Sequence, residues 1–207
     1  MKDALIATVV HDLKNAIASL TTSTGDIARR SMGSELEFDT GKLHATTMAL
    51  SQRLVGFLTL YRSGQTGLVA QSRDNTPEDF LHEVVAGLVL PPETVTVRVA
   101  DAQEGTPFWF FDDYLTRMAL EAAVHNALRF ARSEVVLACA LRNGFLVFSV
   151  ADDGPGLEAD AEGGPSTGLG TALCEAIAAA HTDGARSGKV VLKNRPEGGA
   201  LFELWLP

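Results

Sequence analysis

The apolar residues of the first sixty positions recur with the spacing of a coiled coil, and this pattern constrains the fold more than any other feature of the chain. Two seams alternate steps of four and three residues, and the stretch from Arg30 through an acidic run to Gly41 separates them. Their members are Ile6, Val10, Leu13, Ile17, Leu20 and Ile27, then Leu43, Thr47, Leu50, Leu54, Phe57 and Tyr61. Residues 1–65 are therefore predicted to form an antiparallel helical hairpin, connected at residues 31–42.

A single hairpin leaves much of its apolar surface open to water. Pairing two copies into a four-helix bundle is the usual way to cover such a seam. We therefore expect a homodimer.

The rest of the chain has the pattern of a layered α/β domain. Residues 63–75 are polar and rich in turn formers, which is typical of a linker, and Thr76-Pro77 has the signature of a helix start. Alternating segments at 95–99, 108–111, 134–141, 145–150, 189–194 and 200–206 predict strands, and 114–131 and 170–181 predict helices. Asn143-Gly144 between two strands indicates a hairpin. The sequence predicts a mixed sheet with helices in a domain spanning 74–207.

Composition excludes several classes of function. The net charge is −9, with 17 basic residues that form no stripe, which argues against nucleic-acid binding. Apolar runs are too short for a membrane helix, and the first residues do not form a signal peptide. Cys139 and Cys174 stand far apart among apolar residues, as expected of reduced core thiols in a cytoplasmic protein.

Val10-His11-Asp12-Leu13-Lys14-Asn15 is the first candidate for chemistry. Helical spacing puts His11 and Asn15 on one face, almost opposite the apolar seam. An imidazole can attack phosphorus when a neighbouring carboxylate, here Asp12, orients it and accepts its proton. Asn15 could hold a water for the reverse hydrolysis. The alternative is an ordinary surface histidine.

The second candidate lies on the helix predicted at 114–131. The Asn126 carboxamide is a suitable oxygen ligand for Mg²⁺ when phosphates and water supply the other ligands. Arg129 could approach a phosphate, and Phe130 offers a flat face for a ring. Many amphipathic helices carry an asparagine without binding a metal, so this interpretation competes with an ordinary helix.

Two glycine-containing segments complete the set. In Asp152-Asp153-Gly154-Pro155-Gly156, directly after a strand, a carboxylate can accept a hydrogen bond from an exocyclic amine, and the glycines allow close approach of a ligand. The second segment, Gly168-Leu-Gly170-Thr171, opens a helix whose N-terminal N–H groups suit the phosphates of a nucleotide. It lacks the Gly-Lys-Ser/Thr of a P-loop. Either segment taken alone is compatible with a simple turn.

Together, in this order, these motifs resemble the sensor histidine kinases of two-component systems, over nearly the whole chain. The hexapeptide around His11 resembles the phosphoacceptor box, and His125-Asn126-Ala-Leu-Arg129 the N box. Asp152 to Gly156 and Gly168 to Thr171 resemble the two glycine boxes, and Asn194 to Pro207 the final hairpin. The resemblance implies a helical hairpin, a four-helix bundle on dimerisation, followed by an α/β-sandwich of the histidine kinase, gyrase and Hsp90 ATPase type.

The resemblance also implies roles for residues and partners. His11 would accept the γ-phosphoryl group of ATP, with Asp12 assisting and Asn15 serving a phosphatase reaction. Asn126 would hold Mg²⁺, Asp152 would bind the adenine amine, and Arg129, Phe130, Gly154, Gly156, Gly168, Gly170 and Thr171 would border the nucleotide. Expected partners are a second copy and a response-regulator receiver domain, with any sensor module separate or removed.

Two departures from the family pattern keep other functions open. Ala122 stands where the family usually has a polar residue one turn before the Mg²⁺-binding asparagine, and only residues 157–167 separate the glycine boxes, a short lid. An ATP-independent histidine phosphotransferase and a regulatory pseudokinase are the alternatives to an active kinase.

Overall fold

The structure is a computed structural model that describes residues 2–88, 95–101, 108–157 and 168–207. The chain divides into two compact units. The first comprises residues 1–58 with 89–93, and the second comprises residues 59–88 with 94–207. The short lid expected between the glycine boxes lies almost entirely outside the described residues.

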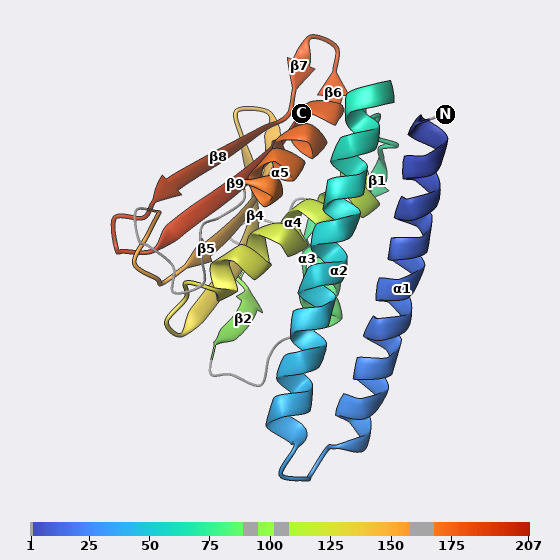
Figure 1. Cartoon of the computed structure of the whole chain (residues 1–207). Helices are drawn as coiled ribbons and strands as arrows, with labels where there is room; N and C mark the ends of the chain where they lie inside the picture. The colour runs from blue at the N-terminus through green and yellow to red at the C-terminus, as the bar shows by residue number, and fades with distance from the viewer. Residues whose placement is uncertain (1, 89–94, 102–107, 158–167) are drawn as a thin grey trace. The chain divides into compact units, whose positions relative to one another are not determined.

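The first unit contains α1 (Lys2–Arg30) and the part of α2 (Glu37–Thr66) up to residue 58; the two long helices form a hairpin and run antiparallel (Figure 1). Gly33, with φ of +77°, follows the end of α1, and its N–H donates a 2.7 Å hydrogen bond to the Glu37 carboxylate. The predicted connection was too long at its far end, because Glu37 and Asp39 fall in the first turn of α2. Carboxylates stabilise a helix N-terminus, so the acidic run extends the helix instead of the loop.

The interior of the hairpin contains polar residues among its apolar ones. Thr24 and Thr47 are both almost fully buried. Thr24 Oγ1 lies 3.1 Å from Nδ1 of His44, which links the two helices. Gly25 allows this approach, because a Cβ at that position would lie 3.1 Å from the His44 ring.

The apolar seams divide between two surfaces of the hairpin. Ile17 and Leu54 are partly buried, whereas about half of the side-chain surface is exposed for Leu13, Leu20, Ile27, Leu43, Leu50 and Phe57. These six exposed residues, the open seam, repeat every seven positions on each helix. The hairpin by itself therefore leaves a continuous apolar stripe uncovered.

The second unit is built on a five-stranded mixed sheet of order β2-β4-β5-β9-β8. Its strands are β2 (Thr96–Val99), β4 (Glu134–Arg142), β5 (Phe145–Asp152), β8 (Lys189–Asn194) and β9 (Ala200–Leu206). Strands β2 and β4 are parallel, and the other pairs are antiparallel. Asn143 and Gly144 have φ of 53° and 72° in the β4–β5 turn, as the Asn-Gly signal predicted.

Helices α3 (Pro77–Gly87), α4 (Asp113–Leu128) and α5 (Leu169–Ala180) pack on the same face of this sheet. The core between the layers holds an aromatic cluster of Phe80, Phe111 and Phe148, whose ring centroids lie 5.0–5.8 Å apart. The predicted fold class is confirmed: a helical hairpin accompanies an α/β domain with a mixed sheet.

Two small sheets were not predicted. Strand β1 (Arg73–Asn75), placed in the linker by the sequence, pairs with β3 (Trp109–Phe111). Strands β6 (Thr182–Asp183) and β7 (Arg186–Ser187) form a short hairpin after α5. All four strands have only two or three residues, too few to show the alternation by which strands are recognised, and β1 pairs with a strand 36 residues away. No helix of the described residues is long and apolar enough to span a membrane.

Candidate nucleotide-binding site

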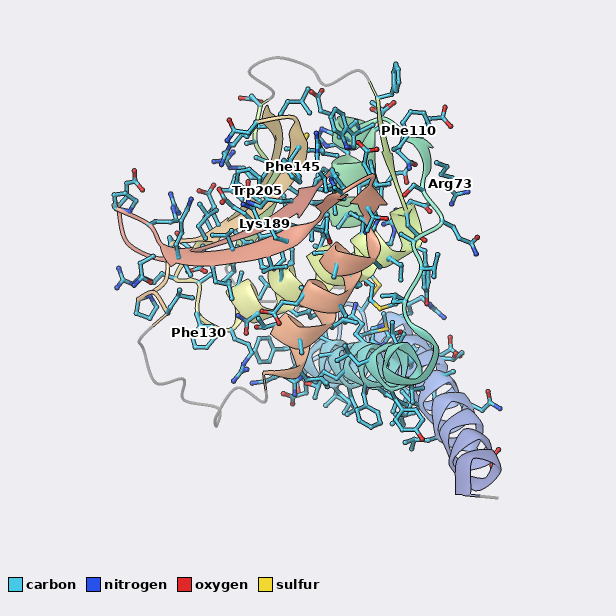
Figure 2. All side chains as sticks on the ribbon, turned by 90° about the horizontal axis from the view of Figure 1, so that it is seen from above. Arg73, Phe110, Phe130, Phe145, Lys189 and Trp205 are labelled. Atoms are coloured by element: carbon cyan, nitrogen blue, oxygen red, sulfur yellow. The ribbon has the colours of Figure 1, made fainter. Side chains whose placement is uncertain are left out.

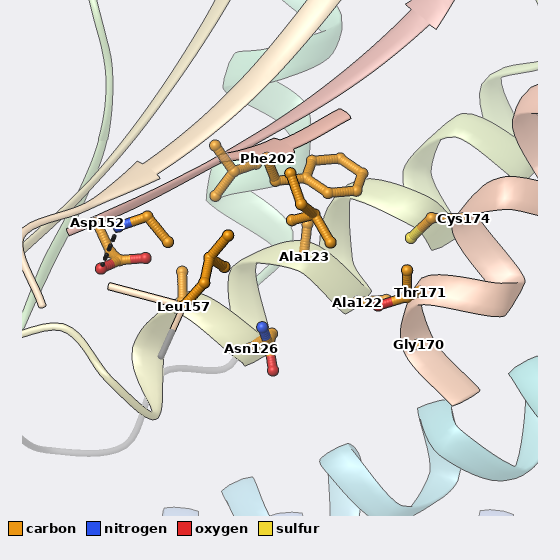
Figure 3. Close-up of a pocket in the computed structure, with 13 residues that line it drawn as sticks. Ala122, Ala123, Asn126, Asp152, Leu157, Gly170, Thr171, Cys174 and Phe202 are labelled. Carbon is orange, nitrogen blue, oxygen red and sulfur yellow. Dashed lines mark hydrogen bonds between the residues drawn. The ribbon is translucent and has the colours of Figure 1, made fainter. Parts of the chain in front are cut away.

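A pocket of the α/β domain opens between α4, the end of β5, the start of α5 and the last two strands (Figure 3). Four residues singled out in the sequence line it: Asn126, Asp152, Gly170 and Thr171. Apolar side chains form much of the remaining wall, among them Leu157, Leu192 and Phe202. Such a lining, with a few polar groups at fixed places, is typical of a small-molecule site.

Asp152 is held at the floor of the pocket by backbone donors. Its Oδ1 accepts hydrogen bonds from the N–H of Gly154 (2.8 Å) and of Ala200 (3.2 Å). The side chain is buried, and the Asp152 carbonyl accepts a 2.8 Å bond from Nη1 of Arg195. The end of β5 and the β8–β9 turn thus fix the carboxylate together, and it can accept a hydrogen bond from an amine in the pocket.

Glycines make this arrangement possible. A Cβ on Gly154 would lie 2.4 Å from the Phe130 carbonyl oxygen, and a Cβ on Gly199 would lie 2.0 Å from that of Asp152. Gly199 also has φ of +88°, a conformation that other residues rarely adopt. The β8–β9 turn can therefore reach Asp152 only with glycine at position 199.

Asp153, the neighbour of Asp152, has a different role that the sequence did not reveal. Its carboxylate accepts hydrogen bonds from the N–H groups of Arg132, Ser133 and Glu134 and from the Ser133 hydroxyl. Burial would raise the pKa of Asp153, but these donors outweigh it and lower the pKa. Asp153 therefore ties the end of β5 to the start of β4 and is committed to structure.

The start of α5 presents a second polar edge to the pocket. Gly168 is the residue before the helix, with φ of +67°, and Gly170 and Thr171 lie in the first turn and line the pocket. The N–H groups of a first helical turn lack acceptors within the helix and attract anions. This edge can hold phosphate oxygens.

Asn126 projects from α4 with an exposed side chain. Ala122, one turn earlier, also lines the pocket and adds no polar group. The described residues contain no cluster of three or more histidine, cysteine or acidic side chains able to hold a metal. The donor set fits Mg²⁺ held by one carboxamide together with nucleotide phosphates and water.

The other predicted nucleotide contacts do not line this pocket. The Arg129 guanidinium stacks over the Phe130 ring, 5.4 Å from its centroid, just beyond the end of α4. Gly154 and Gly156 shape the turn after β5 instead; a Cβ on Gly156 would meet Oδ1 of Asn194 at 2.7 Å. That same oxygen accepts the Leu157 N–H at 2.7 Å, a role for Asn194 that the sequence did not indicate.

Cys174 lines the pocket from α5, but its thiol is unreactive because the thiolate form is disfavoured. Its side chain is buried, and burial raises the pKa of the thiol to about 12. The pKa of Cys139 rises to about 11 for the same reason. Neither forms a disulfide in the structure; Cys174 is buried and Cys139 is partly buried.

The predicted phosphoacceptor residues lie on α1 in the first unit. Asp12 and Asn15 are exposed, and the side chain of His11 lies outside the described part of the structure. One helical turn separates His11 from Asn15.

The model of the histidine kinase-, DNA gyrase B- and HSP90-like ATPase family matches residues 112–207, which include the whole pocket. A sensor histidine kinase component, HK1, of Mycobacterium tuberculosis strain H37Rv is 30% identical over 142 residues, covering 62% of this chain and 79% of that protein. The chain belongs to the sensor histidine kinase family.

Other sensor histidine kinases are longer. A probable sensor histidine kinase of the same species, strain CDC 1551, is 28% identical over 175 residues, 78% of this chain and 44% of its own length. Escherichia coli CpxA is 24% identical over 221 aligned positions, 98% of this chain and 46% of its own. The chain thus spans less than half the length of these two relatives.

Solved histidine kinase structures share the fold. Acinetobacter baumannii histidine kinase AdeS superposes with a TM-score of 0.61 at 19% identity, over 95% of this chain and 96% of that one. Full-length ShkA, solved in complex with AMPPNP, superposes with a TM-score of 0.63 at 21% identity, over 99% of this chain and 45% of that one. The matched ATPase family model covers the pocket, and the sensor histidine kinase relatives belong to two-component signal transduction.

Proposed function

We propose that this chain is a two-component histidine protein kinase that transfers the γ-phosphoryl group of ATP to His11 and then to an aspartate of a response-regulator receiver domain. The observation that supports it most is the pocket formed by Asn126, Asp152 and the start of α5 in a domain of the ATP-binding family. Phosphoryl transfer needs mainly positioning and charge neutralisation, which such a pocket can supply.

The proposed first step is a displacement of ADP from the γ-phosphorus by His11. A ring nitrogen of His11 forms a bond to the γ-phosphorus while the bond to the bridging oxygen breaks, and ADP leaves. Asp12 orients the imidazole and takes up its proton. Mg²⁺, held through Asn126 and the phosphates, would neutralise charge on the leaving oxygens.

In the pocket, Asp152 would bind the adenine amino group, and Gly170 and Thr171 would face the phosphates. The anchored Oδ1 of Asp152 leaves its second oxygen to accept from the exocyclic amine. Asn15, one turn from His11, would position water for removal of a phosphoryl group from the receiver, a phosphatase activity.

A homodimer is part of this proposal. The open seam, with Leu20 at 49% and Leu50 at 50% exposure, is what a second copy would cover. Six half-exposed apolar side chains at heptad spacing on two helices fit a four-helix bundle. We place the protein in the cytoplasm, where ATP and receiver domains are available.

The test is incorporation of label from γ-labelled ATP with Mg²⁺ into the wild type and into His11→Ala and Asn126→Ala. His82→Ala, which removes an exposed histidine of α3, is the matched control. Acid-labile, alkali-stable label is expected in the wild type and His82→Ala only. Label that persists in His11→Ala would place the phosphoacceptor elsewhere.

A wild type that takes up no label is the informative failure, and calorimetry with ATP and Mg²⁺ then separates the alternatives. Absent nucleotide binding, with transfer from a phosphorylated receiver to His11, would identify an ATP-independent phosphotransferase. Nucleotide binding without any transfer would identify a regulatory pseudokinase. Ala122 lines the pocket one turn before Asn126 and offers Mg²⁺ no ligand, which is the observation that favours these two alternatives.

A further inference from the structure

The second face of the five-stranded sheet is covered by side chains and not by a helix of the α/β unit, as far as the structure describes that unit. Residues that alternate along β5 and β9 point to this face, where Val147 pairs with Trp205 and Ser149 with Glu203. Val147 and Glu203 are nevertheless each only 1% exposed. Long side chains from neighbouring strands must therefore lie flat over the sheet.

Glu203 is the anchor of this cover. Its Oε1 accepts bonds from Nη1 of Arg142 (2.6 Å) and Nζ of Lys193 (3.3 Å), and its Oε2 accepts from Nε1 of Trp205 (3.3 Å). A buried carboxylate is tolerated only when it is paired in this way. The carboxylate fixes two cations and one indole ring on the surface.

Two further cations sit on aromatic rings beside it. The Arg186 guanidinium lies 4.4 Å from the centroid of Phe145, and Nζ of Lys189 lies 4.7 Å from that of Trp205. The two rings meet edge to face at 6.0 Å. Cation–π contacts hold the charged groups in place, so less conformational entropy is lost when an anion binds them.

We call Arg142, Phe145, Arg186, Lys189, Lys193, Glu203 and Trp205 the basic face. Figure 2 shows Phe145, Trp205 and Lys189 gathered on the side of the strands away from α4 and α5. It holds four cations and one buried carboxylate, a net charge of +3, in a chain whose net charge is −9. Concentrating one sign of charge on one face attracts partners of the opposite sign.

We propose that the basic face binds an extended acidic segment of a partner protein. Lys189 and Lys193 lie four residues apart on the edge strand β8, with side chains on the same face. Four residues of a strand span about 13 Å. A segment with carboxylates on alternate residues therefore has the spacing to meet both lysines and, beside them, the Arg186 guanidinium.

The same contacts disfavour a nucleic acid as the partner. Single strands bind largely by stacking bases on aromatic rings. Here Arg186 and Lys189 already occupy a face of the Phe145 and Trp205 rings. Carboxylates, which need only the charged groups, fit the face without displacing these cations.

The test is fluorescence anisotropy with a labelled dodecapeptide of alternating glutamate and serine, without nucleotide. The salt is kept at about 50 mM, where the Debye length is roughly 14 Å and charge interactions are only partly screened. Lys189→Glu should weaken binding about threefold to tenfold, given what exposed charge pairs contribute. Lys42→Glu, an exposed lysine on α2, changes the net charge equally and should leave binding unaltered. Thermal melting confirms that both variants fold.

Loss of affinity confined to Lys189→Glu supports the proposal. Absent binding by the wild type, or an equal loss in both variants, overturns it. An oligothymidylate, or vesicles containing phosphatidylserine, that competes more effectively per charge than the peptide would also overturn it, in favour of nucleic acid or membrane. The assay involves neither ATP nor His11, so its outcome is separate from that of the phosphorylation test.

Discussion

The backbone N–H of Asp112 donates a 3.0 Å hydrogen bond to Nε2 of His181, and both residues are buried. Nδ1 of His181 lies 2.8 Å from the Ile177 carbonyl, so the proton is on Nδ1 and the imidazole is neutral. The bond joins the start of α4, the helix that carries Asn126, to the end of α5, whose first turn lines the pocket. The relation between these helices therefore depends on an uncharged histidine.

Stability should consequently fall in mild acid. Burial lowers the pKa of His181, so the unfolded chain takes up a proton at higher pH than the folded one. The free energy of unfolding should decline as pH drops below about 6.5, the unfolded value. In urea unfolding at several pH values, the free energy of unfolding of His181→Phe should no longer fall with pH in this range. It should also be lower by about 1–3 kcal/mol, because the Asp112 N–H loses its acceptor.

His82→Gln is the control for the histidine prediction, because His82 is exposed on α3. It should keep the wild-type slope. If His181→Phe keeps that slope as well, another group titrates.

Asp112 should show graded effects on stability. Its Oδ1 caps α4 by accepting the Leu115 N–H at 2.9 Å, and its Oδ2 accepts the Gln71 N–H at 2.8 Å. Asp112→Asn keeps an acceptor for the cap but turns an NH₂ toward Gln71, so a loss of about 1 kcal/mol is expected. Asp112→Ala loses both bonds and should cost about 2–3 kcal/mol.

Chemical denaturation measures the Asp112 series, with Asp113→Asn as its control. Asp113 pairs with Arg73 at the surface, where solvent screens such pairs, so Asp113→Asn should leave stability nearly unchanged. Equal losses in Asp112→Asn and Asp112→Ala would show that the cap bond does not contribute.

Restoring a polar group at position 122 should strengthen nucleotide binding. Ala122 lines the pocket one turn before Asn126, so an asparagine there would offer Mg²⁺ and phosphate a second carboxamide. Calorimetry of Ala122→Asn with ATP and Mg²⁺ should show a gain of about fivefold, within the usual worth of a hydrogen bond. The gain should vanish when Mg²⁺ is withheld; an equal gain without it would mean that the introduced carboxamide binds the nucleotide directly.

The open seam should govern dimerisation. Leu20→Glu together with Leu50→Glu places charges at positions about half exposed in the hairpin. Burial of those charges in a bundle is costly, so light scattering should report a monomer at concentrations where the wild type is a dimer. Thr22→Glu adds an exposed charge on the other side of α1 and should remain dimeric.

Glu203 should contribute stability that disappears in acid. Burial alone would raise the pKa of Glu203. The hydrogen bonds from Arg142 and Lys193 lower the pKa by more than burial raises it, so the folded pKa lies below the ordinary value. The stability that Glu203 contributes is therefore fully present when the pH is above about 4.3, the pKa of glutamate in the unfolded chain. It is lost as the pH falls through the folded pKa. Glu203→Gln should cost about 1–2 kcal/mol at neutral pH and flatten the acid limb of a stability curve.

The cost at Glu203 is kept modest because Arg142 and Lys193 are 46% and 50% exposed and can return to water. Glu197→Gln, in the same hairpin, is the control: Glu197 is 72% exposed and meets Arg195 only at 3.8 Å. A loss in Glu197→Gln comparable to that in Glu203→Gln would contradict the assignment.

Local patterns were enough to predict most elements, and the order of the motifs, through the family that it resembles, predicted the centre of the pocket. The Asn143-Gly144 turn, the strands that it joins and the helix carrying Asn126 lie where the sequence put them, within a few residues. Asn126, Asp152, Gly170 and Thr171 line one pocket, as the resemblance of their motifs to a known family implied. Periodicity and turn chemistry act over a few residues, so they are readable without a structure.

The sequence by itself thus determined the two periodic regions, the order of the glycine-bearing motifs and the kind of chemistry they allow. Only the tertiary structure decided that Asp153 ties two strands, that His181 supports Asp112 from 69 residues away, and that Glu203 gathers cations on the open face of the sheet. Periodicity states which side chains leave water but not which groups they meet. The partner of a buried polar group is set by long-range packing, which no local pattern encodes.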